Sequence, residues 1–477
     1  MIQTNYIVAI ELSSSKVTGA VGIETINGIK IIATASTLVD GYISKGVVRN
    51  VDKTSEAIAD IINRLEHDLT DNDGKEITIK RAYVSLAGLT MHSIQSKVTR
   101  TFDTYTKISA ETISEMELEN DALFQVPDGY SKVHVITQEY KVDGKTDHNP
   151  IGAPAMAIEG RYLNIVIKKQ FLEQLNESFE QVDTVITDSF VAACMDADIL
   201  LTKDARRNGC ALVNIGAETT TVSIYNNDNL RMLKVLPLGS NNITRDLCAE
   251  QISYDAAEVI KITRGYKSQA SETEPISNET ANNIIRARTG EILQNVRFQI
   301  EESGEMIHNV IFTGGGSRLK NLSILLEEYL PNFNTSIVSD PQLAFECKPG
   351  VNTYGIFTTA LYGLLNHGKE NCCEETSNEP QPTTLFPENI MSGNDTPEED
   401  TTTIANEEEE ARREEEQRKK KEEEDRKKRE EELKKKKKKE KEQALLNKIR
   451  GFGGLFKEFR QDATSEDEDD DINNEDD

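Results

Sequence analysis

The feature that most constrains the fold is a pattern of strand, small polar turn and strand that occurs twice, about 200 residues apart. In the second copy, an apolar strand at 210–215 and an alternating strand at 219–225 flank the turn GAETT, and a third strand follows at 230–238. In the first copy, strands 6–10 and 17–23 flank the turn ELSSSK. The repetition predicts two similar domains.

Both turns have a composition that suits phosphate binding. A tight turn with glycine or several hydroxyls points backbone N–H and side-chain O–H groups at one spot, as phosphate loops do. For either turn alone, a plain hairpin is the alternative. A third loop, TGGGS at 313–317, follows strand 309–312 and precedes helix 319–329. Its glycines allow the backbone to approach a ligand, and the start of the helix adds N–H donors.

The order of these loops resembles that of the superfamily of actin, heat-shock chaperones and sugar kinases. More narrowly, the chain resembles FtsA, the bacterial cell-division homologue of actin, over roughly 1–370 and again at 443–460. The segments that carry the resemblance are VAIELSSSKV (8–17), DGYISKGVVRN (40–50), VHVITQEYKVDG (133–144), NPIG (149–152), DAAEVIKITRG (255–265), VIFTGGGSRLKNL (310–322) and YGIFTTALYGLLNHGKE (354–370).

The resemblance implies an α/β chain with a two-lobed actin-like ATPase fold and an inserted small α+β domain. We expect the first lobe to comprise 1–80 and 168–205, closed by 353–368. The insertion is expected at 81–167, where short strands surround one helix, and the second lobe at 206–352. In FtsA-like chains the insertion serves contacts between protomers.

The resemblance also implies that ATP, with Mg²⁺ as a weaker expectation, binds in a cleft between the lobes. The implied nucleotide-binding residues are Glu11, Ser13, Ser14, Ser15, Lys16, Asn214, Gly216, Ala217, Glu218, Thr219, Glu258, Lys261, Gly314, Gly315, Gly316 and Ser317. Glu258 and Lys261 are three residues apart on a predicted helix and face one way. A surface ion pair is the alternative for these two residues.

Two departures from the superfamily bear on ATP hydrolysis. Active ATPases carry an aspartate in the first strand of each hairpin, whereas this chain has Glu11 and Asn214. Asparagine cannot act as a base and brings no charge to a magnesium shell. Glu218 stands where relatives have glycine, and its charge is unfavourable beside phosphate unless it turns away. We therefore expect weak or absent hydrolysis and assign no catalytic residue. Degraded nucleotide binding is the bolder alternative.

The net charge and the composition argue against some classes of binding partner. The 55 basic and 83 acidic residues give a net charge of −28, which argues against nucleic-acid binding. The six cysteines show no metal spacing, so no metal ligand is assigned. Strand one begins almost at once and no apolar run approaches the roughly 20 residues of a membrane span, so we expect a cytoplasmic protein with peripheral membrane contact.

After about residue 368 the composition changes. Residues 369–406 are polar and predict a disordered linker. Residues 407–442 alternate acidic and basic blocks, which fits either a solvated helical spacer or a disordered tail. Residues 461–477 form an acidic tail, which we expect to weaken attachment to anionic lipid.

Between spacer and acidic tail, residues 443–460 (QALLNKIRGFGGLFKEFR) predict an amphipathic helix that binds the membrane surface. Docking onto the folded body or onto another protein is the alternative. The predicted membrane-facing residues are Leu445, Leu446, Ile449, Phe452, Leu455, Phe456 and Phe459.

By resemblance, the expected function is that of an adaptor at the division septum, on the inner face of the cytoplasmic membrane. It would tether the FtsZ ring, self-assemble as a filament or cluster, and recruit later division proteins. Arg286 and Arg288 on the predicted helix 279–303 are candidates for binding the acidic C-terminal peptide of FtsZ; two solvated arginines are the alternative. A pilus-assembly FtsA-like protein and a soluble actin-superfamily ATPase remain alternative functions.

Overall fold

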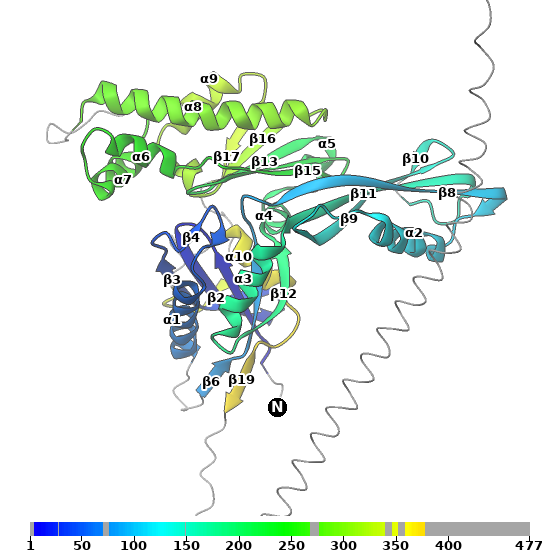
Figure 1. The fold of residues 1–477 in the computed structure, drawn as a ribbon, viewed down its shortest axis with the longest axis horizontal. Coiled ribbons are helices and arrows are strands. Elements are labelled where there is room, and N and C mark those ends of the chain that lie inside the picture. Colours follow the sequence, from blue (N-terminus) through cyan, green and yellow to red (C-terminus); the bar gives the residue numbers. More distant parts are fainter. Residues whose placement is uncertain are drawn as a thin grey trace, which may run out of the picture. The chain divides into compact units, whose positions relative to one another are not determined.

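The computed structural model describes residues 4–26, 28–69, 76–147, 149–267, 276–338, 346–351 and 358–376 (Figure 1). All of them fall within one unit, Met1–Gln381. The predictions for the charged spacer, the terminal amphipathic helix with its seven membrane-facing residues, and the acidic tail lie outside the described residues.

The first lobe is built on a six-stranded sheet with strand order β12-β7-β1-β2-β3-β18. Its strands are β1 (Tyr6–Leu12), β2 (Lys16–Thr25), β3 (Gly28–Leu38), β7 (Arg81–Leu86), β12 (Val185–Val191) and β18 (Glu346–Cys347). The helices of this lobe are α1 (Val51–Leu69), α3 (Lys169–Glu180), α4 (Ala192–Leu200) and α10 (Thr359–His367). Helix α1 buries one face, on which Ile58, Ile61, Ile62 and Leu65 recur at helical spacing.

Two boundaries of this lobe differ from the prediction. β7 pairs in parallel with β1, so 81–86 belongs to the first lobe and not to the insertion. Its run AYVSL is almost wholly buried, as is typical of a strand covered on both faces. β18 pairs in parallel with β3, so the second lobe ends before residue 346 and not at 352.

The inserted domain contains β8 (His92–Lys107), α2 (Ala110–Leu123), β9 (Tyr130–Val142), β10 (Lys145–Asp147) and β11 (Pro154–Lys168). It has its own small core around Ile108, Met116, Ile158 and Tyr162, which confirms the predicted α+β insertion. Its sheet continues into the second lobe, because β8 and β15 meet at the pair His92 and Lys234.

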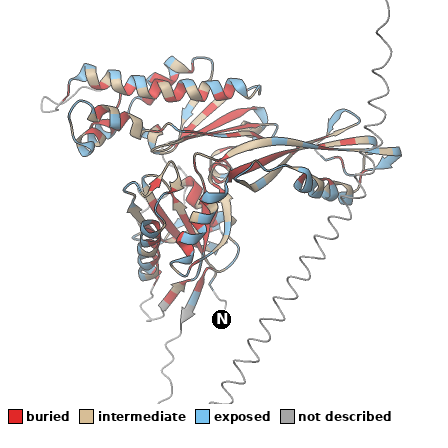
Figure 2. Ribbon diagram, in the orientation of Figure 1, coloured by how far each residue is buried: buried red, intermediate tan, exposed pale blue. Residues whose placement is uncertain are grey.

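The second lobe adds β15, β14, β13, β16 and β17 to that nine-stranded sheet. These strands span Asn229–Leu236, Thr220–Asn226, Cys210–Ile215, Asn309–Thr313 and Asn334–Ile337 respectively. The helices are α5 (Lys203–Asn208), α6 (Asn241–Cys248), α7 (Tyr254–Thr263), α8 (Asn278–Glu302) and α9 (Leu322–Tyr329). Figure 2 shows buried residues on the sheet-facing side of α8 and exposed residues on its outer side. No helix in the described ranges is long and apolar enough to cross a membrane.

The chain returns to the first lobe at its C-terminal end. After α10, β19 (Cys373–Thr376) pairs with β6 (Glu76–Ile79), and both strands lie side by side in Figure 1. Cys372 and Cys373 are 1% and 5% exposed within the core of this lobe. The prediction that the linker begins at 369 is therefore wrong for 369–376. The polar composition of the segment concealed the two buried thiols that anchor it.

Candidate functional site

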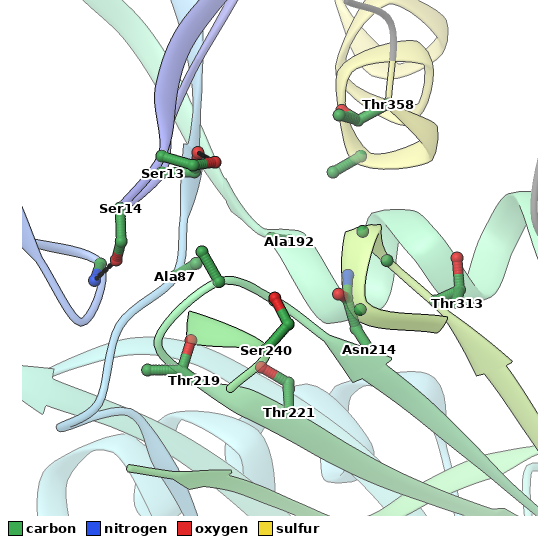
Figure 3. Close-up of a pocket in the computed structure, with 18 of the residues that line it drawn as sticks. Ser13, Ser14, Ala87, Ala192, Asn214, Thr219, Thr221, Ser240, Thr313 and Thr358 are labelled. Carbon is green, nitrogen blue, oxygen red and sulfur yellow. Dashed lines mark hydrogen bonds between the residues drawn. The ribbon is translucent and has the colours of Figure 1, made fainter. Parts of the chain in front are cut away.

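A cavity of about 640 Å³ lies where the β1–β2 turn, the β13–β14 turn and the loop after β16 converge (Figure 3). This volume lies within the range of about 300–1,000 Å³ typical of small-molecule sites. All but two of the predicted nucleotide-binding residues line it: Glu11, Ser13, Ser14, Ser15, Lys16, Asn214, Gly216, Ala217, Thr219, Glu258, Lys261, Gly314, Gly315 and Gly316. The exceptions are Glu218 and Ser317.

The two hairpin turns have matching backbone geometry. Ser13 N–H donates to Lys16 O over 3.0 Å, and Gly216 N–H donates to Thr219 O over 2.8 Å. Within the described part of the chain, several other N–H groups of these turns have no acceptor: those of Ser14, Ser15, Ala217, Glu218 and Thr219. Turns with such N–H groups suit the oxygens of an anionic ligand.

The serine hydroxyls of the first turn are used within the protein. Ser13 Oγ donates to Lys16 O over 2.8 Å, and Ser14 Oγ accepts from Gly46 N–H over 2.8 Å. These bonds shape the turn, whose backbone N–H groups and Lys16 are suited to an anionic ligand. Burial is the largest influence on the pKa of Lys16 and lowers it, while Glu11 acts in the opposite direction.

The glycine loop packs closely on the end of β13. Gly314 has φ 88°, and a Cβ there would lie 2.3 Å from Asn214 Oδ1. Around Gly315 a Cβ would meet nothing within 4 Å, so this residue lies against open space in the cavity wall. Ser317 was predicted to lie by the nucleotide, but it is 2% exposed and donates to Gly314 O over 2.7 Å. It fixes the shape of the loop, which continues into the 3-10 turn η1 (Gly315–Arg318).

Two carboxylates of the first lobe line the cavity: Asp196 is buried and Glu11 is half-buried. Glu11 accepts from Thr358 Oγ1, and Asp196 accepts from Thr359 Oγ1 and, over 2.8 Å, from Asn214 Nδ2. Burial is the main cause that raises the pKa of both groups, and the nearby charge of Asp196 raises that of Glu11 further. The amide of Asn214 thus joins the second lobe to a carboxylate of the first.

Glu258 and Lys261 form an ion pair in which Lys261 is buried and Glu258 is partly exposed, so it is not a pair on the open surface. Lys261 Nζ lies 2.7 Å from Glu258 Oε2, and its side chain is 8% exposed. Thr244 Oγ1 accepts from Lys261 over 2.9 Å and donates to Glu258 over 2.7 Å. The predicted pair therefore lines the cavity, held in place by a hydroxyl of α6.

Glu218 turns away from the cavity. Its carboxylate accepts from Ser44 Oγ, from Lys45 N–H and from Arg245, over 2.9, 2.7 and 2.6 Å. The unfavourable charge beside a phosphate loop is thereby avoided.

Sequence reasoning missed several lining residues. Asp196, Ser240 and Asn241 lie outside the segments that carry the resemblance, whereas Arg318, Thr358 and Thr359 lie within them but were assigned no role. The segment AACMDADIL held a usable signal for Asp196, since an aspartate within an apolar helix is unusual. No group of three or more His, Cys, Asp or Glu able to hold a metal occurs among the residues that the structure describes.

The two arginines proposed for peptide binding are engaged within the protein. Arg286 is paired with Glu328, and Arg288 with Asp246 and with Glu291 Oε2 at 2.7 Å. An incoming acidic peptide would have to exchange with these carboxylates.

Comparisons with known proteins match two separate domains. The family model described as cell division protein FtsA matches 211–345, and the model described as SHS2 domain inserted in FTSA matches 88–166. The second match agrees with an insertion that begins after β7.

Curated relatives carry the same name. Cell division protein FtsA of Porphyromonas gingivalis is 29% identical over 60% of this chain and 63% of its own length, slightly less than two thirds. Cell division protein FtsA of Bacillus subtilis is 26% identical over 68% of this chain and 77% of its own. That of Escherichia coli K12 is 23% identical over 76% and 90%.

Among solved structures, one described as "PilM-PilN type IV pilus biogenesis complex" matches with a TM-score of 0.55 and 16% identity, over 75% of this chain and 97% of that one. At this identity the match shows the fold alone. Together, the two family models and the curated relatives show that this chain is similar to the cell-division protein FtsA, and its fold is actin-like.

Proposed function

We propose that this protein is an ATP-binding adaptor that tethers the FtsZ ring to the inner face of the cytoplasmic membrane at the division septum. The observation that carries the nucleotide part is the convergence of two N–H-bearing turns and a glycine loop on one cavity. Segments from both lobes meet there, which a hairpin of purely structural purpose would not require.

The residues fit an adenine nucleotide. The turn N–H groups and Lys16 would hold the phosphates, while Glu258, Lys261 and Gly314–Gly316 would face the adenosine. Mg²⁺ would arrive with the phosphates and reduce their repulsion. The described residues do not form a metal site of their own.

Slow or absent hydrolysis follows from the partners of Glu11 and Asn214. Glu11 is bonded to Thr358, and the Asn214 amide is committed to Asp196. Neither side chain resembles the ionised aspartate that active members of the superfamily use near the attacking water. Bound ATP would therefore act as a structural ligand that favours self-assembly.

The membrane and partner roles rest on the sequence. The apolar stripe within 443–460 would enter the lipid surface, and the preceding polar linker would let it reach the membrane while the body binds its partners. The FtsZ peptide would bind at α8, where Arg286 and Arg288 would exchange their present carboxylate partners for those of the peptide. Later division proteins would be recruited to the assembled protein.

Co-sedimentation with anionic liposomes tests the tether. Full-length protein is compared with chains ending at Glu442 and at Arg460, each with and without FtsZ. The full chain should pellet and carry FtsZ with it, the chain ending at Glu442 should remain soluble, and the chain ending at Arg460 should pellet most strongly because its acidic tail is removed.

Failure of both full-length protein and the chain ending at Arg460 to pellet would contradict the membrane role. It would also favour the pilus-assembly type of relative, whose fold this chain shares and which needs no terminal membrane helix. Pelleting without FtsZ recruitment would contradict the tether. Rapid ATP turnover would favour the soluble ATPase.

A further inference from the structure

Glu218 connects the second phosphate turn to the first lobe. It lies in the β13–β14 turn, yet one of its oxygens, Oε2, accepts from Ser44 Oγ and from Lys45 N–H. Both donors belong to the first lobe, in the hairpin formed by β4 (Ile43–Ser44) and β5 (Val47–Val48). The side chain of Glu218 is only 13% exposed. A residue that replaces a glycine of the superfamily has therefore become a contact between the lobes.

The β4–β5 hairpin is suited to making such a contact. Lys45 and Gly46 form a two-residue turn in which both φ angles are positive, 52° and 71°. In hairpin turns of this kind the N–H groups of the two central residues do not close the turn and are left for other acceptors. Lys45 N–H is bound by Glu218, and Gly46 N–H by Ser14 Oγ. The N–H group of Lys45 thus binds the second phosphate turn, and the N–H group of Gly46 binds the first.

Arg245 holds Glu218 in this orientation. Its guanidinium donates to the other oxygen, Oε1, over 2.6 Å from α6 of the second lobe. Both oxygens are thus engaged by charge-assisted hydrogen bonds, which are roughly twice as strong as neutral ones.

We propose that Glu218 is the positioning residue of a clasp between the lobes, defined by Glu218, Ser44, Lys45 and Arg245, which slows the release of a bound nucleotide. A ligand held between the two phosphate turns leaves when the turns separate. That separation must break the bonds from Ser44 and Lys45 to Glu218. The inference rests on the proposed nucleotide binding and adds a device that retains the nucleotide in a protein with little hydrolysis.

The test measures release of fluorescent N-methylanthraniloyl ATP from the full-length protein after a chase with unlabelled ATP. Glu218→Gln keeps the size of the side chain but removes its charge, and Ser44→Ala removes one donor outside the cavity lining. Each should speed release roughly tenfold, the effect of losing one hydrogen bond to a charged group. Because both substitutions weaken the same contact, the double variant should release nucleotide more slowly than the product of the two single effects predicts.

Two controls separate the clasp from general damage. Glu250→Gln makes the same chemical change at an exposed residue beyond α6 and should leave the release rate unchanged. Ser44→Thr keeps the hydroxyl donor and should release close to the wild-type rate. The clasp is overturned if Glu218→Gln and Ser44→Ala release at the wild-type rate, or if Glu250→Gln accelerates release equally.

Hydrogen exchange of the backbone amides in segment 42–50, measured on ligand-free protein, tests the contact between the lobes separately from nucleotide binding. If wild-type protein does not bind the fluorescent ATP, the proposed nucleotide binding fails, and with it the role in retention. In that case the rate of amide exchange alone tests the contact. Faster exchange in Glu218→Gln than in Glu250→Gln supports a clasp between the lobes, and equal exchange overturns it.

Discussion

Gly314 occupies a position that a larger residue cannot take without moving the cavity wall. A Cβ there would lie 2.3 Å from Asn214 Oδ1 and 2.6 Å from the backbone oxygen of Ile215, and the φ of 88° is unfavourable for other residues. Gly314→Ala should therefore lower the free energy of unfolding by at least about 2 kcal/mol. Chemical denaturation of the full-length protein measures this.

Gly315→Ala is the matched control for that variant. Its Cβ would meet nothing within 4 Å, and its backbone is not in the left-handed region. The free energy of unfolding should change by less than about 1 kcal/mol. Equal losses for both variants would show that close packing against β13 is not what requires glycine in this loop.

The half-buried carboxylate of Glu11 predicts a pH dependence. Burial raises its pKa above the ordinary value of 4.5, so the folded protein binds this proton more tightly than the unfolded chain does. The stabilisation that protonation provides is complete below 4.5 and is lost as pH rises through the raised pKa of the folded state. Relative to Glu11→Gln, wild-type protein should therefore gain unfolding free energy as pH falls from about 8 to about 5.

Unfolding curves across this pH range provide the measurement, with Glu24→Gln as an exposed control on β2. The control should show a constant difference from wild type over the upper part of the range. A difference between wild type and Glu11→Gln that does not change with pH would contradict the assigned burial of Glu11.

At the scale of elements, strand β19 shows where sequence patterns fail. The pattern of apolar and polar residues predicts the strands of both hairpins and α8 close to their observed bounds, because each of them carries a local period. The segment around β19 has no such period. Its place is determined by Cys372 and Cys373, which enter the core of the first lobe through contacts with residues far away in the sequence.

β7 shows the same limit in another form. Its apolar run AYVSL is typical of a strand, but nothing local indicates which sheet it joins. Its partner is β1, about seventy residues earlier, and the register Ala9 with Tyr83 depends on that long-range packing. The local sequence therefore does not determine where the insertion begins.

Burial of β19 predicts unreactive thiols. Burial raises the pKa of Cys372 to about 11 and that of Cys373 to about 12, so little thiolate is present near neutral pH. In native protein at about pH 8, both should be alkylated by iodoacetamide far more slowly than the partly exposed Cys248. In denaturant all three should react at similar rates.

Mass spectrometry of peptides from timed labelling reads out each site separately. If Cys372 and Cys373 in native protein were labelled as fast as Cys248, β19 would not be docked on β6.

For the whole molecule, the residues that line the site could be predicted better than the hydrogen bonds between them. The phosphate turns and glycine loop are local motifs, so nearly all the residues expected around the nucleotide do line one cavity. The links between them are not local. Asp196 bonds to Asn214 and Thr359, and Glu218 bonds to Ser44 and Lys45, across separations that no spacing rule reveals. Asn214 and Glu218 depart from the family pattern, and their hydrogen-bond partners are therefore known only from the folded chain.

The central claim is that this cavity binds ATP and hydrolyses it slowly or not at all. Isothermal titration of full-length protein with ATP and Mg²⁺, followed by a phosphate-release assay on the same sample, tests it most directly. We expect saturable one-to-one binding that Lys16→Ala weakens by roughly tenfold or more, since a charged contact to phosphate is lost. Phosphate release should stay close to the uncatalysed background. Absence of binding heat, unchanged affinity in Lys16→Ala, or rapid phosphate release would contradict it.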